Sequence, residues 1–335
     1  MKIIIPMAGM GTRMRPHTLT VPKPLIVLAG KSIVQRLVES ITKVYAEPVE
    51  EIGYVIGDFG KKVEKSLIDI AENVGAKAKI YYQHQALGTA HAVWCASESL
   101  SGKTVVAFAD TLFFADFKIN YEPDSIIWVH KVKNPEAYGV VTTDKSGIIN
   151  GFVEKPTEYV SDLAIIGIYY FKDGEKLKKE LNNIIDNKIM KNGEYQLTTA
   201  LENLRNMGLK FVPGEVDEWL DCGNKEITVA THQRILSKST DGKFLSKSAK
   251  IENSTIIQPC YIGNAVEISN SVIGPFVSVG ENSIISNSVI NNSIIQNNSR
   301  IESICSRDSM IGNNAKISGT PCCLSVGDYN MIEIK

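Results

Sequence analysis

The chain has 335 residues, a formal net charge of −1 and 44% hydrophobic residues. This length accommodates one large domain and a smaller one. A near-neutral charge gives no basic field for nucleic acid, and the apolar runs are too short to span a bilayer. The N-terminus lacks a secretory signal pattern, so we expect a cytoplasmic protein with neither membrane nor nucleic-acid partners. The six cysteines show no zinc-site spacing, and we expect buried free thiols.

Predicted strands and helices alternate through the first third of the chain. The predicted strands are Ile3–Ile5, Glu51–Ile56, Ala78–Tyr82 and Thr104–Ala109, and the predicted helices are Ser32–Val44, Lys62–Val74 and Thr89–Ser99. Within the first helix Ile33, Leu37 and Ile41 fall on one face, as the helical period requires. This alternation predicts an α/β fold with a doubly wound, mainly parallel, Rossmann-like sheet, whose ligands lie beyond the carboxyl ends of the strands.

The pattern changes after residue 124. Short turns separate four predicted strands, Ser125–Val132, Ala137–Thr143, Ile148–Glu154 and Leu163–Phe171, which suggest a mixed region around a second ligand. The following predicted elements are helices Glu175–Lys188 and Leu197–Met207, strands Lys210–Pro213 and Glu218–Asp221, and a closing helix Asn224–Leu236.

From Ile251 the composition shifts to Ile, Val, Asn, Ser and Gly, and an aliphatic residue recurs every five or six positions. The expected inward residues are Ile251, Ile257, Ile262, Ile268, Ile273, Val279, Ile285, Ile290, Ile295, Ile301, Ile311 and Ile317. Hexapeptide repeats of this kind predict a left-handed parallel β-helix. We expect a domain over 1–237, the β-helix over 246–320 and a tail over 321–335. Because a β-helix exposes flat sides, we also expect a homo-oligomer formed through it.

A turn of small residues and cations follows the first predicted strand. Its members are Ala8, Gly9, Gly11, Thr12 and Arg13, with Lys23 further along between two prolines. A dinucleotide fingerprint would need glycine where Met14 stands, and a Walker loop ending at Gly30–Ser32 would need glycine at Leu25. Glycines that admit a phosphate to backbone N–H groups, with cations beside them, favour a triphosphate site instead.

These motifs resemble the sugar nucleotidyltransferase (nucleotide-sugar pyrophosphorylase) family, whose opening signature is G-x-G-T-R followed by a P-K-P lysine. The resemblance covers residues 1 to about 235. It is nearest to members that act on glucose 1-phosphate and carry a C-terminal left-handed β-helix. It implies that Arg13 and Lys23 are catalytic, and that the small residues Ala8, Gly9, Gly11 and Thr12 bind the nucleotide.

Gln83, Gly88 and Thr89 resemble the family segment that reads the base of the nucleotide. A glutamine amide offers both a donor and an acceptor to a pyrimidine edge, which carries carbonyls and an imide N–H. Gly88 allows the backbone to approach the ring. Because family members that use guanine nucleotides tend to lack this glutamine, the resemblance favours dTTP or UTP.

Asp110 and Asp221 each follow a predicted strand. Each aspartate taken alone is as readily a turn residue. Mg²⁺ prefers one or two carboxylates together with phosphate oxygens and water, and two aspartates at strand ends suit that preference. The resemblance implies that Asp110 and Asp221 are the metal pair and that Mg²⁺ is the cofactor.

The resemblance also implies a sugar-phosphate set, whose members are Gly139, Glu154, Lys155, Gly167 and Glu194. Lys155 would hold the phosphate of the sugar, and Glu154 its hydroxyls. The acetamido-sugar branch usually has Asn-Thr where this chain has Ile165 and Ile166, so a plain hexose is expected. Thr199 replaces the aspartate that is usual in the family; as a threonine it could still cap a helix.

The sequence thus predicts an enzyme that transfers a nucleotidyl group from dTTP or UTP to a hexose 1-phosphate, with release of pyrophosphate. Alternatives in the same class are a mannose-1-phosphate guanylyltransferase and an N-acetylglucosamine-1-phosphate uridylyltransferase. Alternatives in other classes are a non-catalytic regulatory subunit and a β-helix acyltransferase. The acyltransferase usually needs a histidine base on the β-helix, but the last histidine is His232. The regulatory subunit would tend to lose the cations and carboxylates that this chain keeps.

Overall fold

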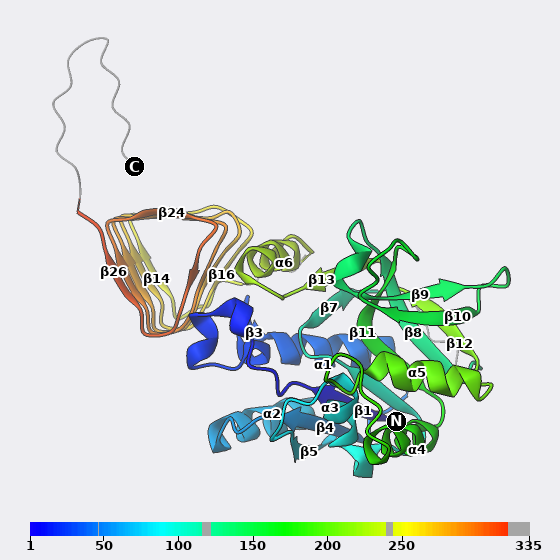
Figure 1. Cartoon of the computed structure of the whole chain (residues 1–335). Coiled ribbons are helices and arrows are strands. Elements are labelled where there is room, and N and C mark those ends of the chain that lie inside the picture. The colour runs from blue at the N-terminus through cyan, green and yellow to red at the C-terminus, as the bar shows by residue number, and fades with distance from the viewer. Residues whose placement is uncertain (46, 116–121, 239–243, 321–335) are drawn as a thin grey trace. The chain divides into compact units, whose positions relative to one another are not determined.

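The structure is a computed structural model that describes residues 1–45, 47–115, 122–238 and 244–320. The expected tail over 321–335, with Cys322 and Cys323, lies outside these residues. The chain packs into two compact units (Figure 1). The first contains residues 1–26 and 31–227, and the second contains residues 27–30 and 228–335. The expected domain end at residue 237 stays a prediction; the packing boundary lies between Ile227 and Thr228, near the start of the helix that contains residue 237.

The first unit is built on a sheet of nine strands whose centre is parallel, as predicted. The parallel strands, in spatial order, are β6 (Thr104–Ala107), β1 (Lys2–Pro6), β4 (Glu51–Ile56) and β5 (Lys77–Tyr82). β1 is fully buried from Ile3 to Ile5, because neighbouring strands pair with both of its edges. A continuous apolar strand at the centre of a doubly wound sheet is the expected consequence.

Antiparallel strands extend this sheet on the side of β6. They are β8 (Ser125–Lys131), β9 (Gly139–Thr143), β10 (Ile149–Glu154) and β11 (Leu163–Phe171), and β12 (Phe211–Glu215) pairs in parallel with β8. The helices are α1 (Ile33–Val44), α2 (Lys61–Asn73), α3 (Thr89–Trp94), α4 (Gly174–Asp186), α5 (Leu197–Asn206) and α6 (Lys225–Lys238). The predicted α/β class and the mixed region are therefore confirmed.

Three local differences from the predicted elements occur between residues 94 and 114. β6 ends at Ala107 rather than Ala109, and an additional short strand β7 (Thr111–Phe114) pairs with β13 (Glu218–Asp221). α3 ends at Trp94, and a separate 3-10 turn over Ser97–Ser99 follows. Hydrophobic periodicity and strand propensity are local signals. They do not predict the β7–β13 pairing, because it joins segments that are distant in sequence.

The second unit contains the left-handed parallel β-helix. Three stacked sheets of short parallel strands form its walls, in the orders β14-β17-β20-β23-β26, β15-β18-β21-β24 and β16-β19-β22-β25. The bounds of the first sheet are Lys250–Glu252, Glu267–Ser269, Ile284–Ser286, Arg300–Glu302 and Lys316–Ser318. Those of the second are Thr255–Ile256, Val272–Ile273, Val289–Asn291 and Cys305–Arg307. Those of the third are Cys260–Ile262, Val277–Val279, Ser293–Ile295 and Met310–Ile311.

The aliphatic column predicted to face inward is mostly buried. The prediction for Ile257 was wrong: this residue is 42% exposed, and its neighbour Ile256 pairs with Ile273 and packs against the core. Ile317, in the last coil, is also exposed at 36%. The expectation of buried thiols fails at Cys305, which is exposed on the second sheet.

Within the second unit, α6 and the segment 27–30 lie against the third sheet. His232 of α6 is fully buried and hydrogen-bonded to Ser278. The Gln296 amide donates to the Val27 carbonyl at 2.9 Å, and the Gly30 backbone is so close to the Tyr261 ring that an added Cβ would lie 2.5 Å from it. From Thr228 onward, α6 therefore packs as part of the β-helix unit.

Candidate functional site

A pocket of about 420 Å³ opens beyond the carboxyl ends of β1 and β6, within the size range of small-molecule sites. Its lining residues are Pro6, Met7, Ala8, Gly9, Gly11, Thr12, Arg13, Lys23, Pro24, Gln83, Ala86, Gly88, Thr89, Ala92, Phe108, Ala109, Asp110, Glu194 and Gly223. Every residue predicted to bind the nucleotide is among them, as are both predicted catalytic cations. The fold therefore brings together side chains from segments as distant in the chain as Pro6 and Gly223. They meet beyond the carboxyl ends of the strands, as expected for a doubly wound sheet.

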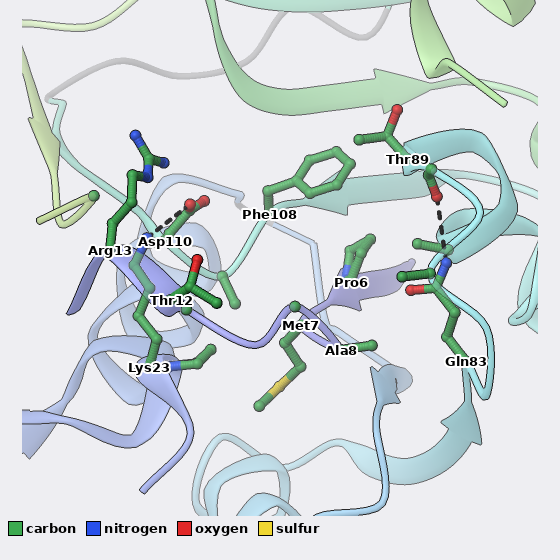
Figure 2. A pocket seen from close by; sticks show the side chains of 18 of the residues that line it. Pro6, Met7, Ala8, Thr12, Arg13, Lys23, Gln83, Thr89, Phe108 and Asp110 are labelled. Atoms are coloured by element: carbon green, nitrogen blue, oxygen red, sulfur yellow. Dashed lines mark hydrogen bonds and ion pairs between the residues drawn. The ribbon is translucent and has the colours of Figure 1, made fainter. Parts of the chain in front are cut away.

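Cations gather at one end of this pocket. Figure 2 shows Arg13, Lys23 and Asp110 on one side and Gln83 with Thr89 on the opposite side. Lys23 Nζ lies 2.9 Å from Asp110 Oδ2, and the lysine side chain is only 9% exposed. Asp110 thus holds the nearly buried Lys23 side chain at this end of the pocket.

In the turn after β1, the Gly11 backbone lies close to the side chains of Thr18 and Lys23, which only glycine allows. Gly11 has φ +57°, in the left-handed region, and an added Cβ would lie 3.0 Å from Lys23 Cβ and 3.1 Å from Thr18 Cγ2. The Thr18 hydroxyl donates to the Gly11 carbonyl at 2.8 Å, which holds the turn against the segment that carries Lys23. Glycine at this position thus lets Arg13 and Lys23 share one end of the pocket.

Asp221 lies near Asp110 but does not line the pocket, whereas Gly223, two residues further on, does. Burial is the main cause that raises the pKa of Asp221, and the charge of Asp110 raises it further, against the opposing charges of Lys23 and Arg13. Two carboxylates held together in a partly buried place repel each other, and a bound cation would relieve this repulsion. The pair therefore suits a hard divalent ion that takes its other ligands from phosphate and water. Within the described ranges, no cluster of three or more His, Cys, Asp or Glu side chains could hold a metal alone.

The opposite end of the pocket is formed by the loop between β5 and α3. The Gln83 amide nitrogen donates to the Gly88 carbonyl at 3.3 Å and lies 3.0 Å from His91 Nδ1. Gly88 has φ +108°, and an added Cβ would lie 2.5 Å from the Tyr195 carbonyl oxygen. The Leu197 N–H donates to Thr89 Oγ1 at 2.9 Å, which ties the start of α3 to the start of α5.

The sugar-phosphate set lies mostly outside the pocket lining. Only Glu194 lines the pocket, whereas Gly139 and Glu154 pair across β9 and β10, and an added Cβ on Gly139 would meet Glu154 Oε2 at 2.9 Å. The Thr198 hydroxyl donates to the same Glu154 oxygen at 3.4 Å. Lys155 follows directly, with φ +45°. Gly167, at φ +85°, contacts Phe108 of the pocket wall.

Several pocket residues have no chemical signal in the sequence. Phe108, Met7 and Pro24 form an apolar part of the pocket wall. In the sequence, Met7 and Phe108 are distinguished only by their position directly after β1 and β6. The sequence also does not predict the ion pair between Lys23 and Asp110, because its partners are 87 residues apart. The expectation that Thr199 caps a helix was wrong: it lies inside α5, where its buried hydroxyl has no hydrogen-bond partner among the described residues.

None of the described helices is long and apolar enough to cross a membrane. The profile of a protein family described as Nucleotidyl transferase matches residues 2–238. A glucose-1-phosphate thymidylyltransferase from Streptomyces antibioticus is 28% identical, with all of both chains covered. The bifunctional protein GlmU from Methanococcus maripaludis is 32% identical over 82% of this chain and 62% of its own length. A UDP-glucose pyrophosphorylase structure from Acinetobacter baumanii shares the fold, with TM-score 0.60 and 20% identity over 72% of this chain and 94% of its own.

Proposed function

Because this chain belongs to the Nucleotidyl transferase family, we propose that it transfers a nucleotidyl group from dTTP or UTP to a hexose 1-phosphate, with glucose 1-phosphate as the first candidate. The observation that carries the proposal is the polarity of one pocket, with Arg13 and Lys23 at one end and the Gln83 amide at the other. Charge at one end suits a triphosphate, and an amide at the other suits a base. The full-length match to a glucose-1-phosphate thymidylyltransferase supports the choice of sugar.

The reaction is an in-line displacement at the α-phosphorus of the nucleotide. A phosphate oxygen of the hexose 1-phosphate forms a bond to this phosphorus, the bond to the bridging oxygen breaks, and pyrophosphate leaves with the bonding electrons. The attacking oxygen is already anionic, so no general base is required. Catalysis then depends on position and on neutralised charge.

The side chains of this chain divide that work. Arg13 neutralises the departing pyrophosphate, Lys23 the α-phosphate, and Lys155 the phosphate of the sugar, while Glu154 and Glu194 accept hydrogen bonds from sugar hydroxyls. Asp110 and Asp221 would hold Mg²⁺, which when bound supplies further neutralisation of the triphosphate. The ion pair with Asp110 holds Lys23 at this end of the pocket, where a phosphate would compete with the carboxylate for it.

A panel of nucleotides and sugar phosphates tests this function. Purified full-length protein with Mg²⁺ is incubated with dTTP, UTP, CTP, GTP or ATP and with the 1-phosphates of glucose, galactose, mannose or N-acetylglucosamine. We expect pyrophosphate release with dTTP or UTP and a plain hexose 1-phosphate. Release confined to GTP with mannose 1-phosphate, or to N-acetylglucosamine 1-phosphate, would replace the proposal by one of those alternatives. No release with any pair would reject it.

A further inference from the structure

The amide of Gln83 has its orientation determined by two neighbours. Its nitrogen donates to the Gly88 carbonyl oxygen at 3.3 Å, and the same nitrogen lies 3.0 Å from His91 Nδ1. A backbone carbonyl has only lone pairs, so the amide nitrogen must face it. The rotated amide would place two oxygen atoms against each other. The Gly88 carbonyl therefore favours the orientation in which the nitrogen of the Gln83 amide faces the protein.

His91 engages the second hydrogen of the same amide nitrogen. This is possible only if Nδ1 carries no proton, so the imidazole is neutral with its proton on Nε2. The ring stacks with Trp94, at a centroid distance of 5.7 Å, and with Tyr195 at 6.5 Å. Burial lowers the pKa of His91, which favours the neutral ring that this contact needs. His91 does not line the pocket, so it acts on a ligand through Gln83.

The remaining group of the amide is its oxygen. Figure 2 shows the Gln83 oxygen directed into the pocket, away from Gly88. With both amide hydrogens engaged, Gln83 can only accept a hydrogen bond from a base. The ring N3 of thymine or uracil carries a hydrogen, whereas the N3 of cytosine carries a lone pair.

We infer that His91 is a positioning residue that holds the Gln83 amide so that an acceptor alone faces the base, which selects thymine or uracil over cytosine. This inference rests on the proposed function and extends it to the choice among pyrimidines. The protein achieves this without a contact between His91 and the nucleotide. A cytosine base would place its N3 lone pair against the amide oxygen, and a buried unmatched pair of acceptors is costly.

The test compares two substitutions of His91 in the full chain. His91→Leu removes the acceptor, and His91→Asn places an amide oxygen near the position of Nδ1. We expect His91→Leu to lower the ratio of kcat/KM for dTTP over CTP roughly tenfold, mainly through KM, because the hydrogen bond that holds the amide is lost; this change equals about 1.4 kcal/mol. His91→Asn should restore the ratio to within about threefold of the natural protein. An unchanged ratio in His91→Leu, or an equal loss in both variants, would overturn the inference.

A second measurement needs no turnover and no variant. Nitrogen NMR of the imidazole in the natural protein at pH 7 reports which ring nitrogen carries the proton. We expect His91 to be neutral with its proton on Nε2, and a proton on Nδ1 would refute the inference. Absence of pyrophosphate release by the natural protein would reject the proposed function, while the NMR result would still decide whether His91 holds the amide.

Discussion

Of the two cations that line the pocket, Lys23 has the side chain that is more confined by its surroundings. Its side chain is 9% exposed and its ammonium group has Asp110 at 2.9 Å, whereas Arg13 extends from an exposed turn. A restricted cation loses little entropy when a phosphate arrives, and preorganised charge is the main means of stabilising a phosphoryl transition state. We therefore assign Lys23 the larger share of charge neutralisation at the α-phosphorus.

Replacing Lys23 tests that assignment. We expect Lys23→Ala to lower kcat for pyrophosphate release by a factor on the order of 10²–10³, because one preorganised charge is lost. Circular dichroism should show an unchanged fold. Lys61→Ala, at a lysine with 89% of its side chain exposed on α2, provides the matched control and should retain full turnover. Near-normal turnover in Lys23→Ala would remove Lys23 from the mechanism.

The charge of Glu154 is proposed to serve the sugar site, but it lowers the stability of the fold because the carboxylate is partly buried. Burial is the main cause that raises its pKa, and Glu194 contributes, while Lys155 and the hydrogen bond from Thr198 act in the opposite direction. A carboxyl whose pKa is raised in the folded state holds its proton more tightly there than in the unfolded chain. Folding stability is therefore lost as the pH rises above the ordinary value of 4.5 and Glu154 ionises.

The neutral variant Glu154→Gln should show both sides of this conflict. At pH 7 we expect the melting temperature to rise by about 1–3 °C, since a partly buried charge is removed, and this gain should disappear below pH 4.5. Turnover should fall because a charged acceptor for the sugar is lost. Glu158→Gln, at an exposed glutamate of the following loop, should change neither quantity. A melting-temperature gain that is the same at pH 4 and pH 7 would contradict the assigned cause.

At the scale of elements, the start of α3 forms the end of the pocket that we propose takes the base. Gly88 precedes the helix with φ +108°, and the Ala90 N–H donates to the Tyr195 carbonyl at 2.9 Å. The same carbonyl oxygen would lie 2.5 Å from a Cβ on Gly88. Both a positive φ and a close backbone neighbour therefore require glycine here.

A pair of glycine substitutions separates these two requirements. Gly88→Ala should raise KM for the nucleotide roughly tenfold or more and lower the melting temperature, because α3 and the segment at Tyr195 must move apart. Gly75→Ala has a similar φ of +78° but open space around its Cβ, so it should cost about 1–2 kcal/mol of strain without altering KM. Equal KM values for both variants would show that the close approach has no role in binding.

For the whole molecule, the β-helix offers one outward face suited to a second copy of the chain. The first sheet carries charged residues such as Lys250, Glu267 and Arg300 in register, and the third sheet is covered within its unit by α6 and residues 27–30. The second sheet presents Thr255, Val272, Val289 and Cys305, with Val289 48% exposed. Small apolar side chains on a flat sheet favour contact with another such surface.

We therefore expect the full chain to self-associate through this second sheet. Light scattering should give a mass greater than the 36.8 kDa of a single chain. Val289→Glu should reduce that mass because it places a charge in the apolar column, whereas Lys316→Glu on the charged sheet should leave it unchanged. A natural protein that has the mass of one chain would disprove this expectation.

Much of this protein could be read from local sequence signals. The alternation of strands and helices, the hexapeptide period and the spacing of glycine, arginine and lysine predicted both architectures and the residues around the pocket, because periodicity and turn chemistry act over a few neighbouring residues. Contacts between distant segments were decided only by the tertiary structure. Lys23 meets Asp110, 87 residues away, and His232 packs against Ser278, 46 residues away, so that the helix after β13 belongs to the β-helix unit. The Gln83 amide is a local case of the same limit: its nitrogen meets the Gly88 carbonyl and His91 Nδ1, and both contacts depend on how the loop and α3 fold in three dimensions.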